Sequence, residues 1–170
     1  MRILVRSPGT KQRVAAVVLV LVLGFAIKLI AAEPEAIASQ TREWRAVHEK
    51  EILHEFADLL AIPNIAADLP NIERNATAIK AMCEKRGLAT QLLRIEGVPP
   101  IVVADLRVPG AQRTIAIYAH YDGQPVDVSR WKSDPWKPVV RDQGGNDMDW
   151  RAAESLDPEW RIYARSAGDD

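Results

Sequence analysis

The first regular pattern of apolar and polar residues along the chain is helical. Apolar or aromatic side chains recur at steps of four and form one stripe, made by Trp44, His48, Ile52, Phe56 and Leu60. This period predicts an amphipathic helix whose striped face lies against a core. Ser39 or Thr41 can cap its start, and Pro63 ends it, so the helix is expected to run to about Leu60. His48 is interpreted as a histidine at the edge of the core face.

A second helix and several strands follow. Asn71 can cap a helix that continues through Arg86, and Gly87 supplies a left-handed stop. Short runs rich in β-branched residues then predict strands at Thr90–Ile95, Ile101–Arg107 and Arg161–Tyr163. We expect the helix pair and these strands to belong to an α/β sandwich.

The stretch Thr114–Asp127, TIAIYAHYDGQPVD, has the strongest combination of strand character and chemistry. Its apolar part, Ile115–Ala119, is short and uncharged, which predicts a central strand buried on both faces. Residues two apart in a strand point to the same side, so His120 and Asp122 are expected to emerge together. They lie at the carboxyl end of the strand, where open α/β sheets bind ligands.

The N-terminal segment predicts export. Residues 1–32 hold five basic residues and no acidic ones, and Val14–Ile27 gives fourteen residues without a charge. A secretory signal needs about seven to fifteen such residues, whereas a spanning helix needs about twenty. We expect a signal peptide at 1–32, a mature N-terminus between Ala32 and Ser39, and a periplasmic or secreted protein. The alternative is an uncleaved membrane anchor over residues 14–32.

Composition narrows the remaining choices. The chain has 170 residues, 48% of them hydrophobic and 26% charged, which suits one globular domain after the leader, over 33–170. That part carries 17 basic against 23 acidic side chains, so nucleic acid is excluded as the expected partner. Cys83 is the single cysteine, so any metal must be held by histidine and carboxylates.

Three pieces of sequence together resemble a known family. Ile101–Asp127, RWKSDPWKP at 130–138 and RIYARSAGDD at 161–170 resemble the two-metal peptidase family of aminoacylase, carnosinase, carboxypeptidase G and succinyl-diaminopimelate desuccinylase. The sequence HYDGQPVD at 120–127 is most similar to the dipeptidase branch of this family. The resemblance implies a mixed-sheet α/β zinc-peptidase catalytic domain, with a dipeptide or N-acylated amino acid as substrate, and it admits a homodimer in the complete enzyme.

The resemblance also implies roles for particular residues. His120 would bind one of two zinc ions, Asp122 would be the catalytic-site carboxylate that orients His120, and Asp169 would bridge both ions. Where the family usually has Gly-Arg-Gly before the bridging aspartate, this chain has Ala164-Arg165-Ser166. Neither alanine nor serine adopts positive φ as freely as glycine.

The resemblance implies that further functional residues of the family would follow the position of Asp170. They are a Glu-Glu pair that includes the general base, a further carboxylate ligand and a distant histidine. The expectation is therefore the N-terminal part of a catalytic domain, inactive by itself. The alternative is a non-catalytic, membrane-tethered remnant that binds metal or peptide.

Two further features are interpreted as structural. His54 stands among acidic residues and is expected to be a solvated helix residue. Gly144–Trp160 resembles an insertion relative to the family pattern, and its scattered acidic residues are expected on a solvated surface loop.

Overall fold

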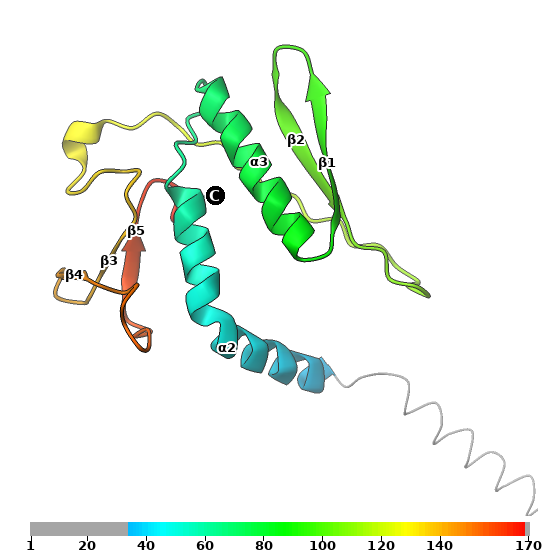
Figure 1. Ribbon diagram of the computed structural model, residues 1–170, viewed down its shortest axis with the longest axis horizontal. Coiled ribbons are helices and arrows are strands. Elements are labelled where there is room, and N and C mark those ends of the chain that lie inside the picture. The colour runs from blue at the N-terminus through cyan, green and yellow to red at the C-terminus, as the bar shows by residue number, and fades with distance from the viewer. Residues whose placement is uncertain (1–33, 169–170) are drawn as a thin grey trace, which may run out of the picture. The chain divides into compact units, whose positions relative to one another are not determined.

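The computed structural model describes residues 34–168 (Figure 1). The predictions for the leader at 1–32 and for Asp169 therefore lie outside the described residues. Within them the elements are α2 (Pro34–Leu60), α3 (Leu69–Lys85), β1 (Ala89–Ile95), β2 (Val98–Asp105), the short helix η1 (Val128–Arg130), β3 (Val139–Arg141), β4 (Asp147–Met148) and β5 (Arg161–Tyr163). None of the helices in this part of the chain is long and apolar enough to cross a membrane.

Helix α2 begins at Pro34, so the prediction that Ser39 or Thr41 caps it is wrong. The helix spans two structural units, which divide after His48. In the part before this boundary the predicted stripe is not buried, and Trp44 is 55% exposed. His48 stacks on Trp44 with ring centroids 4.2 Å apart, and its Nδ1 lies 2.7 Å from the carbonyl oxygen of Trp44. His48 therefore packs on its own helix rather than at the edge of a core. The second half of α2 buries Ala57 and Leu60.

Helix α3 begins earlier than the pattern predicts. Its cap is Asp68, whose carboxylate accepts a hydrogen bond from the backbone N–H of Asn71, so the assignment of Asn71 as the cap is wrong. Proline follows at the start of the helix, where its missing N–H costs nothing. The predicted end is confirmed, because Gly87 has φ 79°.

Strands β1 and β2 form an antiparallel hairpin that packs on α3. The turn is Glu96-Gly97, and Gly97 has φ 74°, the left-handed conformation that a tight hairpin turn requires. Strand β2 consequently starts at Val98, three residues before the predicted start. The two predicted strands and their order are otherwise confirmed.

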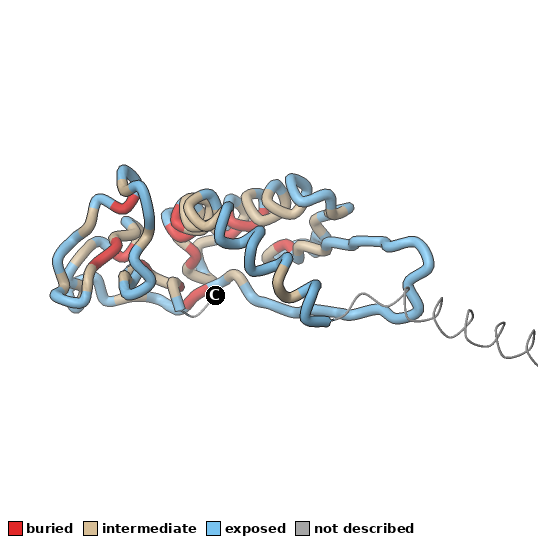
Figure 2. The backbone as a smooth tube through the Cα atoms, turned by 90° about the horizontal axis from the view of Figure 1, so that it is seen from below, coloured by how far each residue is buried: buried red, intermediate tan, exposed pale blue. Residues whose placement is uncertain are grey.

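The prediction of a buried central strand at Thr114–Ala119 is wrong. These residues are not in a strand, and all of them are exposed (Figure 2). A strand needs neighbours for its N–H and C=O groups. Strands β1 and β2 pair with each other, and no backbone group within 34–168 pairs with residues 114–119. Strand propensity therefore produces an extended segment here, but not a sheet.

The second sheet is antiparallel, has the order β4-β3-β5, and includes the predicted strand at Arg161–Tyr163. Part of Gly144–Trp160 lies in it, so the interpretation of this segment as a solvated loop is wrong in part. Its acidic residues are exposed, but Trp150 is buried with Ala57 and Val140. His54 is not simply solvated either, because its ring lies 4.8 Å from that of Trp150. The segment Gly144–Trp160 thus closes a small core against α2.

The described residues combine helices with sheets, which agrees with the α/β expectation at this coarse level. Both sheets among the described residues are antiparallel rather than mixed, and the parallel pairing found there is one isolated bridge between Ile65 and Gly123.

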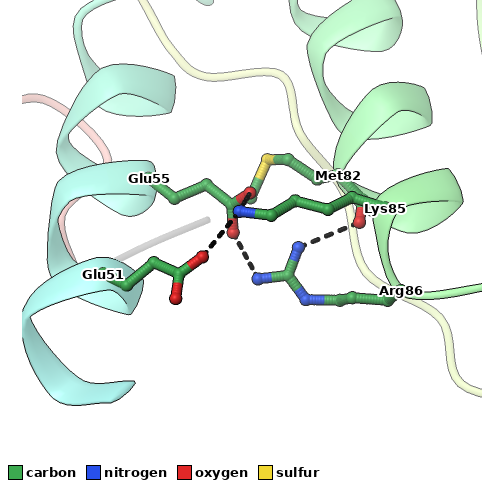
Figure 3. Close-up of polar contacts among 5 residues, drawn as sticks. All are labelled: Glu51, Glu55, Met82, Lys85 and Arg86. Atoms are coloured by element: carbon green, nitrogen blue, oxygen red, sulfur yellow. Dashed lines mark hydrogen bonds and ion pairs between the residues drawn. The ribbon is translucent and has the colours of Figure 1, made fainter.

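Charged side chains link α2 to the end of α3 (Figure 3). Lys85 Nζ lies 2.8 Å from Glu51 Oε1, and Arg86 donates to Glu55 and to the carbonyl oxygen of Met82. The hydrogen bond from Arg86 lowers the pKa of Glu55 below its ordinary value. The side chains of Glu55 and Arg86 are 18% and 44% exposed, so the carboxylate is partly shielded from solvent while its partner is not.

A lowered carboxyl pKa predicts a loss of stability in acid. The contribution of Glu55 is present above its unfolded-state pKa and is lost as pH falls through the folded-state value. We expect Glu55→Gln to reduce the free energy of unfolding at pH 7, and the difference from wild type to shrink between about pH 5 and pH 3. Urea denaturation at several pH values measures this. The control is Glu96→Gln in the exposed hairpin turn, and an equal pH trend in the two variants would contradict the assignment.

The burial of Trp150 predicts a large cost for its removal. Trp150→Ala leaves a cavity beside Ala57 and Val140, and we expect the free energy of unfolding to fall by about 3–5 kcal/mol. The matched control is Trp44→Ala, which removes an exposed tryptophan and should cost less than about 1 kcal/mol. Both are measured by urea denaturation of the full chain. Similar losses in the two variants would mean that Gly144–Trp160 does not build a core.

Candidate metal centre

The stretch that carries His120 is fastened to the loop after α2. The backbone N–H of Gly123 donates to the carbonyl oxygen of Asn64 at 2.6 Å, and the N–H of Ala66 donates to the carbonyl oxygen of Gly123 at 3.0 Å. A Cβ atom at Gly123 would lie 2.9 Å from Arg165 Nη2 and 2.9 Å from Asn64 Oδ1. Glycine is therefore required here because the backbone and two side chains approach closely.

The side chain of Asn64 joins this stretch to a third segment. Its Nδ2 donates to the carbonyl oxygen of Tyr121 at 3.2 Å and to Ser166 Oγ at 2.9 Å. Arg165 strengthens the junction, because its Nε donates to the carbonyl oxygen of Gln124 at 3.2 Å. Asn64 and Ser166 are buried, so these bonds are shielded from water. Residues 64, 121 and 166, far apart in sequence, are thus held together.

His120 and Asp122 lie side by side, as the strand pattern predicted, although they do not end a strand. His120 Nδ1 is 2.9 Å from the backbone oxygen of Asp122 and 3.6 Å from its Oδ1. A carbonyl oxygen can only accept, so His120 Nδ1 carries the proton in this contact. In a neutral imidazole the Nε2 atom then carries the lone pair that a metal ion would take. The two side chains are 45% and 51% exposed.

A small pocket of about 100 Å³ adjoins His120. Its floor is apolar and comes from both helices, while His120, Tyr121 and Ser166 contribute to its polar side. Tyr121 donates its hydroxyl proton to the carbonyl oxygen of Pro100, and burial raises the pKa of the Tyr121 phenol. Tyr121 therefore has a structural role that ties the stretch to β2.

The donor set fits a zinc ion only in part. An imidazole nitrogen oriented through its other nitrogen is a usual zinc ligand. Within residues 34–168, however, no three histidine, cysteine or acidic side chains lie close enough together to hold an ion. Of the three predicted residues, the structure brings His120 and Asp122 together, and Asp169 lies outside the described part.

Two residues of this junction escaped prediction, and a third has an unusual backbone conformation. Asn64 and Gly123 were assigned no role, because a single amide in a loop and one glycine after a strand carry no distinctive signal. Ser166 has φ 68° and is the one non-glycine residue of the described chain with positive φ. It thus adopts the left-handed conformation that a glycine at this position would favour.

Comparison with known proteins identifies no relative: no family model, no curated protein and no solved structure matches the chain.

The positive φ of Ser166 predicts that glycine is more stable than alanine at position 166 and less stable than alanine at position 164. Ser166→Gly and Ser166→Ala both lose the hydroxyl that Asn64 contacts, but alanine keeps a Cβ in the left-handed region. We therefore expect the glycine variant to be more stable than the alanine variant by about 1 kcal/mol. At Ala164, where φ is not positive, glycine should instead cost about 0.5–1 kcal/mol. Urea denaturation measures both, and equal stability of the Ser166 variants would contradict the prediction.

Proposed function

We propose that this chain contributes part of the active site of an exported, metal-dependent peptidase or amide hydrolase of the two-zinc type. His120 and Asp169 are the metal ligands, and Asp122 orients His120. The substrate class is a dipeptide or an N-acylated amino acid. The observation that carries the proposal is the contact between His120 Nδ1 and Asp122, joined through Asn64 to the loop that precedes Asp169.

The His120 contact supports the proposal through its chemistry. Histidine ligands in metal sites almost always donate their second ring N–H to a carboxylate or carbonyl oxygen, which fixes the tautomer and raises ligand basicity. The backbone oxygen of Asp122 accepts from this nitrogen at 2.9 Å, and the Asp122 carboxylate lies 3.6 Å away, near it but beyond hydrogen-bond distance.

The Asn64 junction supports the inclusion of Asp169. Ser166 is bonded to Asn64, which also holds Tyr121, the neighbour of His120. Asp169 follows Ser166 by three residues, and three residues span at most about 11 Å. The chain can therefore bring an aspartate from this loop to the His120 side of the junction, which a metal bridge requires.

Hydrolysis of an amide needs more than these residues. A pair of zinc ions, when bound, polarises the substrate carbonyl and generates hydroxide from water. Asp122 holds the proton on His120 Nδ1, and the carboxylate of Asp169 supplies negative charge. A general base typically contributes about 10²–10⁴-fold, and none of the residues assigned here has that role. We therefore expect the 170-residue chain to bind metal without hydrolysing dipeptides.

Metal titration of the full chain tests the assignment. We expect Co²⁺, a visible substitute for Zn²⁺, to develop ligand-field absorption that disappears in His120→Ala and Asp169→Ala. Asp122→Ala removes the carboxylate 3.6 Å from His120 Nδ1 but keeps the backbone oxygen 2.9 Å away, so we expect Zn²⁺ affinity to weaken by about 10-fold, the low end of the loss for an orienting partner. His48→Ala and Glu154→Ala are the matched controls, because they remove a histidine and an exposed carboxylate elsewhere. Unchanged binding in His120→Ala would refute the site.

Catalysis is tested separately from binding. In a version of the chain extended by sequence encoded downstream, Asp169→Ala should lose two-metal occupancy together with dipeptide hydrolysis. Hydrolysis by the present 170 residues would contradict the assignment of the base to a later segment. Metal binding without hydrolysis in every extended version would favour the non-catalytic alternative.

A further inference from the structure

The pocket of about 100 Å³ beside the candidate metal centre has an apolar part that metal binding does not use. Three of its side chains, Phe56, Leu59 and Leu60, come from α2, where spacings of three and four residues place them on one side of the helix. Ile62 from the following loop and Ile79 from α3 complete this part. Two helices thus border a small apolar space next to the proposed metal ligand.

The two buried asparagines that line the pocket already use their amide protons within the protein. Asn64 Nδ2 makes two hydrogen bonds at the junction described above. Asn75 Nδ2 donates to the carbonyl oxygens of Pro63 and Asn71, at 2.8 Å and 2.9 Å. A side-chain amide nitrogen carries two protons, so a polar ligand would have to break one of these bonds to gain a donor. An apolar group needs none of them, and the pocket therefore favours an apolar ligand.

The size of the pocket limits the group that it can hold. Apolar cavities of about 150 Å³ that are lined by leucine, isoleucine and phenylalanine stay dry and bind benzene, a ring of six carbons. By proportion, about 100 Å³ holds roughly four carbons. The side chains of leucine and isoleucine have this size. An alanine methyl leaves most of the space empty, and an aromatic side chain exceeds it.

We propose that this pocket binds the side chain of a leucine or isoleucine in the substrate and so sets the preferred residue. Because His120 lines the same pocket, a ligand whose side chain fills it carries its amide group close to the imidazole. The role of the bound group as part of a substrate rests on the proposed function, whereas its binding does not. Burial of the additional carbons favours leucine over alanine by roughly 10–100-fold in dissociation constant.

Titration of the full chain without metal tests the pocket. The probes are the N-acetyl amides of leucine, alanine and tryptophan, which are uncharged and differ only in the side chain. We expect the leucine compound to bind roughly 10–100-fold more tightly than the alanine compound, and the tryptophan compound no more tightly than the alanine compound. NMR shifts of the side-chain amides of Asn75, in the pocket, and Asn146, outside it, report binding and its location. Equal affinity for the leucine and alanine compounds, or no binding of the leucine compound, would overturn the proposal.

Two variants change the pocket in opposite directions. Ile79→Phe fills it and should remove the preference for the leucine compound, whereas Leu69→Phe, an exposed change on the same helix, should keep that preference. Ile79→Ala enlarges the pocket by three carbons and should tighten binding of N-acetyl-phenylalanine amide by roughly tenfold. Circular dichroism confirms that the variants are folded. An unchanged preference in folded Ile79→Phe, or no gain in Ile79→Ala, would also overturn the proposal.

These results can be distinguished from those that test the metal centre, because the probes are titrated without metal. Preference for the leucine compound without Co²⁺ absorption would confirm the aliphatic site and refute the proposed function. Co²⁺ binding that depends on His120, without preference for the leucine compound, would refute the aliphatic site alone.

Discussion

The arrangement around His120 depends on the hydrogen bonds of one buried residue, Asn64. Its backbone oxygen accepts from Gly123, and its side chain donates to Tyr121 and to Ser166. The three segments joined in this way come from the loop after α2, from the middle of the chain and from its end. An amide can do this because it offers two donors, and burial makes each unsatisfied bond costly. Loss of this one side chain would remove the bonds that join Tyr121 to Ser166.

The helices supply the fixed frame for that junction. Helix α3 covers the β1–β2 hairpin, and charged side chains at its end hold it to α2. Asn75 of α3 donates to the carbonyl oxygen of Pro63, just before Asn64. The loop that carries Asn64 is therefore fixed at both ends by helices. Because rigid elements hold the loop, its hydrogen bonds can position the stretch around His120 even though that stretch lacks regular structure.

The segment before His120 illustrates a different constraint. Residues 114–119 have the composition of a buried strand, yet they are exposed. A strand is stable only when neighbouring strands satisfy its backbone, whereas a helix satisfies its own. The helices α2 and α3 and the local hairpin therefore form from nearby residues. A central strand depends on partners that the described residues do not supply.

Local pattern was enough to predict that two helices are present and where they end, the strands at 90–95, 101–107 and 161–163, and the proximity of His120 to Asp122. Each of these depends on residues close in sequence, through helical period, turn chemistry or the two-residue spacing of an extended chain. Tertiary structure alone decided that Asn64 joins three distant segments and that Trp150 enters a core. It also decided that Ser166 adopts positive φ, since neither serine nor its neighbours favour that conformation. These features depend on contacts between residues about 40 to 100 positions apart, whose energies a local pattern does not contain.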